Sequence, residues 1–79
     1  MSKHAQDVMR EREIQAEWVA ATLAKPALRE PDPTDERLSH ALLPIADFGY
    51  RVLRVVYNHT VDPVNVVTAF FDRAMKGKL

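Results

Sequence analysis

The chain has 79 residues, with 11 basic and 11 acidic side chains and no cysteine. This length predicts one small domain over residues 1–79, and the lack of cysteine excludes disulfides and thiolate chemistry. No apolar run approaches the roughly 20 residues that span a bilayer, and the N-terminus lacks an apolar signal segment, so we expect a cytoplasmic protein without membrane contact. A net charge of zero gives no support to binding of nucleic acid by overall charge alone.

Two short helices are predicted for the first third of the chain. Ser2 is a suitable N-cap for a helix from about Lys3 to Arg12. A second helix is predicted from about Ala16 to Ala24, and Pro26 ends it because the residue before a proline is driven out of the α region. The two segments predict a helical hairpin over about residues 3–25.

The first predicted helix carries a histidine and an arginine on its apolar side. At about 100° per residue, His4 lies at one edge of the apolar arc and Arg12 lies near its middle. His4 is a candidate general acid or base, because imidazole titrates near neutral pH, or a packed group that hydrogen-bonds a strand carbonyl. Arg12 is a candidate phosphate ligand, or a structural group paired with Glu11, Asp47 or Asp72.

Prolines divide the middle of the chain. A loop is predicted over about residues 30–36, after a short edge strand at about Ala27–Arg29. The apolar segment Leu38–Phe48 fits a strand or a helix, and a strand is favoured because Pro44 would interrupt a helix. A proline in a strand then predicts an edge position or a bulge.

The last third predicts an antiparallel hairpin. Tyr50–Tyr57 and Val64–Phe71 are rich in β-branched and aromatic residues, and Asn58–Pro63 between them has turn composition. The sheet is expected over about residues 37–72, followed by a short tail over 73–79. The predicted fold class is α+β, with the helical hairpin packed on a three- or four-stranded antiparallel sheet.

Alternation along these two strands makes both faces of the sheet apolar. In the second strand, Val64, Val66, Thr68 and Phe70 are expected to share one face. Arg51 and Arg54 are expected to project from opposite faces of the first strand. Two short helices can cover only one face of such a sheet. The second face must therefore curl on itself or be covered by another chain, which makes self-association a candidate property.

The opening and closing segments resemble a family of small bacterial domains of unknown function. Its members open with His-Ala-x-x-Arg-Met-x-Glu-Arg-Gly-Ile and close with a Val-Val-Thr-aromatic strand, and their layout is similar to that of the RelE/ParE/BrnT-like toxins. Two positions depart from the pattern: Val8 replaces the first arginine and Glu13 replaces the glycine. The matching positions are His4, Ala5, Met9, Glu11, Arg12, Ile14, Val19, Leu23, Pro26, Arg51, Val55, Val56, Val67 and Thr68.

The resemblance implies a toxin-like domain that binds RNA, or cleaves it without a metal, within a bacterial toxin–antitoxin system. RNA and an antitoxin protein are the implied partners, and neither a cofactor nor a metal is expected. The alternative is a non-enzymatic module that dimerises or binds a protein through its second sheet face, and the neutral net charge and Val8 favour this alternative. The side chains implied for the RNA function are His4, Arg12 and Thr68 in catalysis, and Arg51, Arg54 and Tyr57 in phosphate binding.

Overall fold

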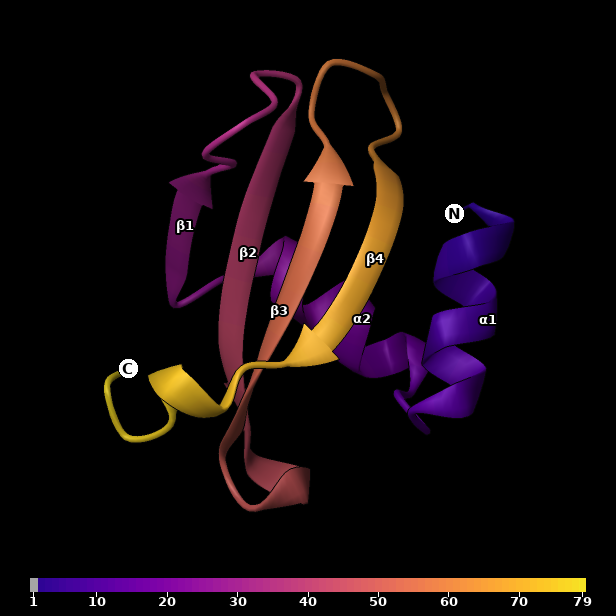
Figure 1. Cartoon of the computed structure of the whole chain (residues 1–79). Helices are drawn as coiled ribbons and strands as arrows, with labels where there is room; N and C mark the ends of the chain where they lie inside the picture. The colour runs from indigo at the N-terminus through magenta and orange to yellow at the C-terminus, as the bar shows by residue number, and fades with distance from the viewer. Residues whose placement is uncertain (1) are drawn as a thin grey trace.

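The computed structural model describes residues 2–79, which form two helices followed by a four-stranded antiparallel sheet (Figure 1). The predicted α+β class is therefore confirmed, and the sheet has the larger of the two expected strand numbers. The elements are α1 (Lys3–Glu11), α2 (Ala16–Ala24), β1 (Leu28–Pro31), β2 (Leu38–Ile45), the 3₁₀ turn η1 (Ala46–Phe48), β3 (Arg51–Asn58), β4 (Asn65–Phe71) and the 3₁₀ turn η2 (Arg73–Met75).

Local signals set the two helices. The Ser2 hydroxyl accepts a hydrogen bond from the Ala5 N–H at 3.1 Å, which is the predicted N-cap of α1. The turn between the helices contains Glu13 in the left-handed region, with φ of 57°. This is the position where the resembled family has glycine, the residue that adopts positive φ at least cost.

The strands follow the order β1-β2-β3-β4, so β1 and β4 are the two edges. Glu30 and Pro31 were predicted to lie in the loop, but they belong to β1, because they pair with His40 and Ser39 of β2. The loop therefore begins at Asp32, two residues later than predicted.

β2 is an inner strand, yet its proline lies at a locally open edge. β1 pairs with β2 only as far as Leu42, opposite Leu28, and Pro44 lies beyond that point. The missing N–H of Pro44 therefore removes no hydrogen bond to β1. The strand ends at Ile45 and not at Phe48 as predicted, because Ala46–Phe48 turn into η1.

A bulge in β4 changes which side chains share a face. Val56 pairs with Thr68 and Tyr57 pairs with Val66, so Val67 is an extra residue in the ladder. The extra residue reverses the alternation. Val66 consequently lies in the hydrophobic core together with Ala69, and the prediction that Val66 shares a face with Thr68 is wrong.

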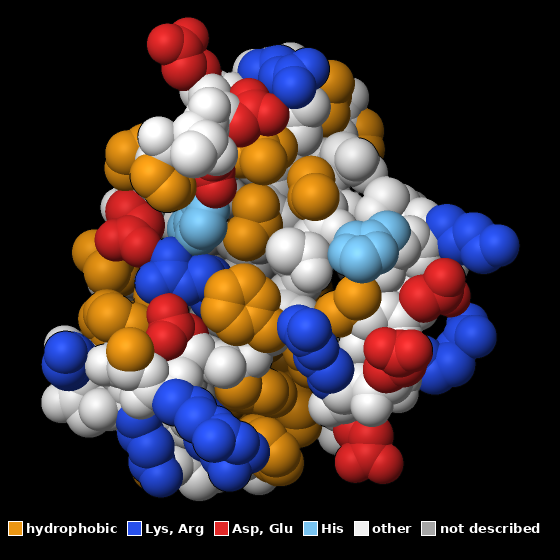
Figure 2. All heavy atoms as spheres, viewed as in Figure 1, with side chains coloured by type: hydrophobic (Ala, Val, Ile, Leu, Met, Phe, Trp, Pro, Cys, Tyr) orange, Lys and Arg blue, Asp and Glu red, His pale blue; other side chains and the backbone are white. Residues whose placement is uncertain are grey.

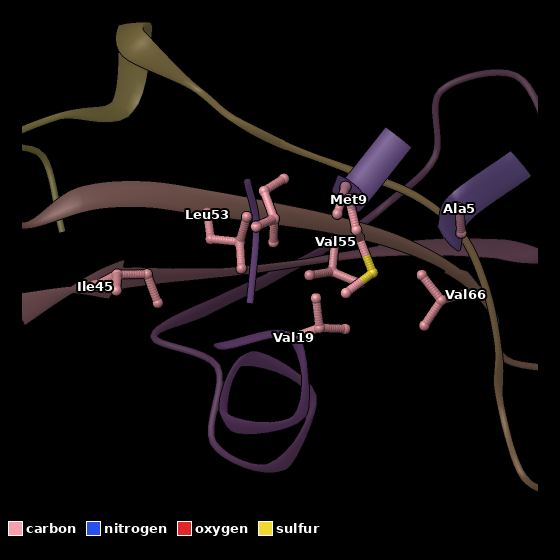
Figure 3. Close-up of a cluster of buried hydrophobic side chains, with 9 residues drawn as sticks. Ala5, Met9, Val19, Ile45, Leu53, Val55 and Val66 are labelled. Atoms are coloured by element: carbon pink, nitrogen blue, oxygen red, sulfur yellow. The ribbon is translucent and has the colours of Figure 1, made fainter. Parts of the chain in front are cut away.

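The main core lies between the helices and one face of the sheet (Figure 3). α2 crosses behind the sheet and contacts β2 and β3, whereas α1 lies beside β4 (Figure 1). The fully or almost fully buried apolar side chains of this core are Ala5, Met9, Ile14, Val19, Ile45, Leu53, Val55, Val66 and Ala69.

The second face of the sheet is covered only in part by the chain itself. Leu42, Val52 and Val56 project from this face and are buried. The C-terminal segment crosses the lower end of the sheet on the side away from α2, and η2 contacts β3 (Figure 1). Thr68 and Phe70 pair with Val56 and Arg54 on this same face and are only half-buried, so self-association through it stays a prediction. No helix within residues 2–79 is long and apolar enough to cross a membrane.

Candidate functional site

A basic groove runs along the outer edge of β4. It is an open hollow of about 550 Å³ that straddles this edge strand. A smaller hollow of about 260 Å³ shares three of its residues and adds Lys76. In the same view as Figure 1, blue side chains gather in the lower part of the molecule, around the C-terminal segment (Figure 2). We call the larger hollow the β4-edge groove; its lining residues are Arg12, Arg51, Thr68, Phe70, Phe71 and Arg73.

Arg12 reaches the groove from the C-terminal end of α1. Its Nη1 donates a hydrogen bond to the carbonyl of Ala69 at 3.1 Å, so the guanidinium binds the outward side of β4. The expected carboxylate partners do not hold this side chain: no ion pair within residues 2–79 includes Arg12. A guanidinium has five N–H donors, and one bond to a carbonyl leaves most of them for a ligand.

Arg51 enters the groove from the start of β3. Its Cζ lies 5.0 Å from the centre of the Phe48 ring, which is a cation–π contact. Stacking occupies one flat face of the guanidinium and leaves its N–H edges open. The side chain of Arg51 is exposed, as is that of Arg73 on η2, and neither has an ion-pair partner in the described chain.

Aromatic packing supports the groove from the helical side. The ring centroids of Phe48 and Phe71 are 4.9 Å apart, and Trp18 lies 5.5 Å from Phe48 and 6.0 Å from Phe71. These contacts join α2, η1 and β4, so they fix the Phe48 ring on which Arg51 stacks.

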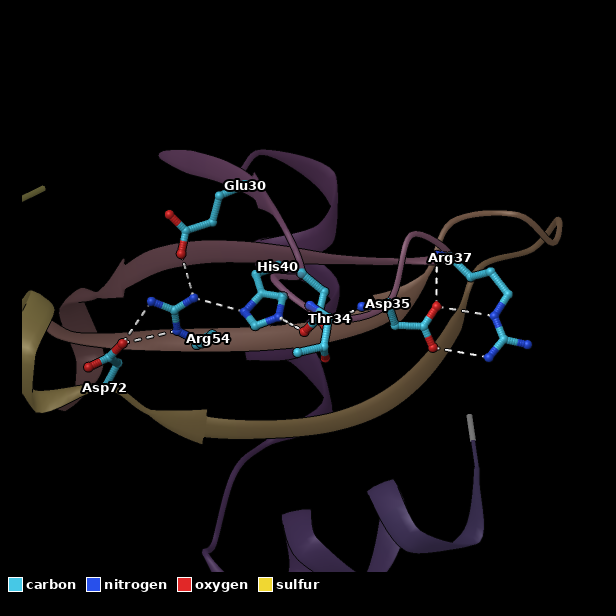
Figure 4. A network of polar contacts seen from close by, with 8 residues as sticks. Glu30, Thr34, Asp35, Arg37, His40, Arg54 and Asp72 are labelled. Atoms are coloured by element: carbon cyan, nitrogen blue, oxygen red, sulfur yellow. Dashed lines mark hydrogen bonds and ion pairs between the residues drawn. The ribbon is translucent and has the colours of Figure 1, made fainter.

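Arg54 lies on the second sheet face, in a polar network (Figure 4). Its Nη1 donates to Glu30 Oε1 at 2.6 Å, and Nε and Nη2 donate to Asp72 Oδ2 at 3.0 and 2.8 Å. Burial alone would lower the pKa of Arg54, but the hydrogen bonds to these two carboxylates outweigh it and raise the pKa. Arg54 is therefore a bound structural cation and does not line the groove.

His40 extends the same network. Arg54 Nη1 lies 2.8 Å from His40 Nδ1, so Nδ1 accepts this hydrogen bond and the Nε2–H is donated to Asp32 Oδ1 at 2.7 Å. The contact with His40 and the hydrogen bonds from Thr34 hold the pKa of Asp32 far below its ordinary range. Both ring nitrogens of His40 are engaged, which assigns this histidine to structure (Figure 4).

Two other predicted site residues lie outside the groove. His4 is exposed on α1, about 12 Å along the helix axis from Arg12. Tyr57 is buried on β3. Within residues 2–79, no group of three or more His, Asp or Glu side chains is arranged to hold a metal ion.

The sequence matches a family model described as "Domain of unknown function (DUF4258)" over residues 1–71. The chain belongs to this family. Membership of a family of small domains of unknown function, expected from the resemblance, is thereby confirmed. No curated protein and no solved structure matches the chain. The DUF4258 match includes Arg12, Arg51 and Thr68, whereas Arg73 follows the matched segment.

The fold of this DUF4258 domain brings together only part of the predicted set. Arg12, Arg51 and Thr68 line one groove, although the first and the last are 56 positions apart in the sequence. Sequence reasoning missed Phe70, Phe71 and Arg73, which line the same groove. The sequence holds no local signal for Arg73, because its position depends on how the C-terminal segment turns back after β4.

Proposed function

We propose that this DUF4258 domain binds RNA in the β4-edge groove and holds the phosphate backbone with Arg12, Arg51 and Arg73. One observation carries the proposal: three arginines from α1, β3 and η2 converge on one open hollow. None of them has a carboxylate partner within residues 2–79. Unpaired guanidiniums around a hollow attract an anion, and their planar N–H edges match phosphate oxygens.

The other lining groups suit the same ligand. Thr68 is half-buried at the groove, and its hydroxyl is a donor for a phosphate oxygen. Phe70 presents an apolar ring in the same hollow. The one acidic side chain of the adjoining smaller hollow, Asp72, is neutralised by Arg54. The local charge of the groove is therefore positive even though the net charge of the chain is zero.

The proposal covers binding and leaves cleavage aside. Metal-independent cleavage requires an acid and a base within hydrogen-bond reach of the reacting oxygens. His4 does not line the groove, so catalysis by His4 stays a prediction from the resemblance. A toxin-like role within a toxin–antitoxin system would use this binding step.

The test is a titration of labelled RNA by fluorescence anisotropy, near neutral pH and at two salt concentrations. About three phosphate contacts predict a slope of log K against log salt near −2 for a single strand. Arg51→Ala and Arg73→Ala should each raise Kd by about fivefold or more, the loss of one charged contact. Arg37→Ala is the charge-matched control, because Arg37 is exposed, pairs with Asp35 and lies outside the groove.

Equal losses in the three variants would mean that RNA responds to net charge, and the groove would then not be the site. No binding by the wild-type chain at low salt would exclude the RNA function and leave the non-enzymatic protein-interaction module.

A further inference from the structure

The connection between η1 and β3 places a tyrosine in a strained backbone conformation. Gly49 has φ of 66° and Tyr50 has φ of 58°, so two consecutive residues are left-handed. The Tyr50 N–H bonds to the carbonyl of Ile45 at 2.9 Å, which closes this turn. Glycine adopts the left-handed region freely, but for a bulky side chain it costs about 1–2 kcal/mol.

Packing does not compensate for this strain. Tyr50 is 66% exposed, the largest exposed fraction among the exposed large apolar residues of the described chain. Its hydroxyl makes no hydrogen bond within residues 2–79. Asparagine or glycine at this position would close the same turn with less strain. A strained and exposed aromatic residue points to function, because local strain persists where the side chain has a use.

The residues around Tyr50 indicate which function its side chain has. Arg51, the next residue, lines the β4-edge groove and stacks on Phe48, which is itself 40% exposed. The connection between β2 and β3 therefore carries two accessible aromatic rings beside the arginine that is proposed to bind phosphate. Aromatic rings next to a basic groove are the arrangement by which proteins hold the bases of single-stranded nucleic acid.

We propose that Tyr50 stacks on an unpaired base of the nucleotide whose phosphate is bound by Arg51, and that the ligand is accordingly single-stranded RNA. This inference rests on the proposed function and names the substrate class of the same groove. Bases inside a duplex are already stacked and offer no face to a side chain, whereas a single strand can extend one base outward.

The decisive variant is Tyr50→Asn, because asparagine tolerates the left-handed region better than tyrosine. Its melting midpoint should equal or exceed that of the wild type, while its affinity for a single-stranded RNA of about 12 nucleotides should fall about tenfold. Tyr50→Phe should retain the affinity, since the ring is kept. Binding of a duplex with the same sequence should be equally weak in all three proteins.

Each outcome bears on a different claim. If Arg51→Ala loses affinity and Tyr50→Asn does not, the stacking inference is wrong and the proposed function stands. If Tyr50→Asn weakens single-stranded and duplex RNA equally, Tyr50 does not read an unpaired base. If the wild type binds no RNA, both proposals fail. As a second measurement, the NMR signals of the Tyr50 ring protons should shift when single-stranded RNA is added, and unchanged signals would overturn the inference.

Discussion

Arg54 holds Asp72 through two guanidinium nitrogens that reach the same carboxylate oxygen, Oδ2, with Nε at 3.0 Å and Nη2 at 2.8 Å. The other oxygen of Asp72 accepts the N–H of Ala74 and caps η2. One carboxylate therefore links β3 to the C-terminal segment, and Arg73 of the β4-edge groove follows it directly. The structural arginine of the second sheet face thus helps to position a proposed ligand arginine.

Loss of Arg54 should destabilise the fold strongly. Its side chain is 13% exposed and binds Glu30, Asp72 and His40, so Arg54→Ala leaves carboxylates without a partner and should lower the free energy of unfolding by about 2–4 kcal/mol. The control is Arg37→Ala, because Arg37 makes a similar pair with Asp35 but is 70% exposed, and this change should cost less than about 1 kcal/mol. Urea unfolding gives both values, and similar losses in the two variants would contradict the structural role of Arg54.

Arg12 should contribute moderately to stability. Arg12→Ala removes the hydrogen bond to the Ala69 carbonyl at the edge of β4 and should lower the free energy of unfolding by about 0.5–1.5 kcal/mol. Arg10→Ala, at an exposed position of the same helix, should change it by less than about 0.5 kcal/mol. A loss as large as that of Arg54→Ala would indicate a buried partner that the structure does not show.

Removal of the backbone strain at Glu13, the left-handed residue between the helices, should stabilise the chain. Glu13→Gly removes the strain at φ of 57° but increases the freedom of the unfolded chain, and the expected net gain is about 0.5 kcal/mol. Gln6→Gly, at an exposed interior position of α1, should instead lower stability by about 0.5–1 kcal/mol. Thermal melting followed by circular dichroism distinguishes the two. A loss at both positions would mean that Glu13 makes a contact worth more than its strain.

Protonation of Asp32 should lower the stability of the fold in acid. Its pKa is lowered in the folded chain from the ordinary 3.8, so the stabilisation is complete above about pH 4 and is lost as the pH falls toward the folded-state pKa. Asp32→Asn should flatten the decline of the melting midpoint between about pH 4 and pH 2. Asp7→Asn, at an exposed position of α1, should leave the decline unchanged. An Asp32→Asn curve parallel to that of the wild type would show that other carboxylates dominate.

Much of the fold was predictable because its signals are local. Ser2 begins α1 and Pro26 follows α2, and both act within one turn of the chain. The bulge that places Val66 in the core was not predictable, because it arises from the pairing of β4 with β3. The predicted start of the loop was wrong for the same reason: Glu30 and Pro31 become strand only when β2 is present to pair with them.

The sequence by itself determined the two helices, the β3–β4 hairpin and the opposite projection of Arg51 and Arg54, because side-chain period and turn composition act between near neighbours. Only the tertiary structure decided which arginine is available to a ligand. Arg54 meets Glu30 and Asp72, and Arg51 meets Phe48, only after strand register and the turn of the C-terminal segment are set. Whether an arginine is paired or free depends on residues that are distant along the chain, and a local sequence pattern carries no information about them.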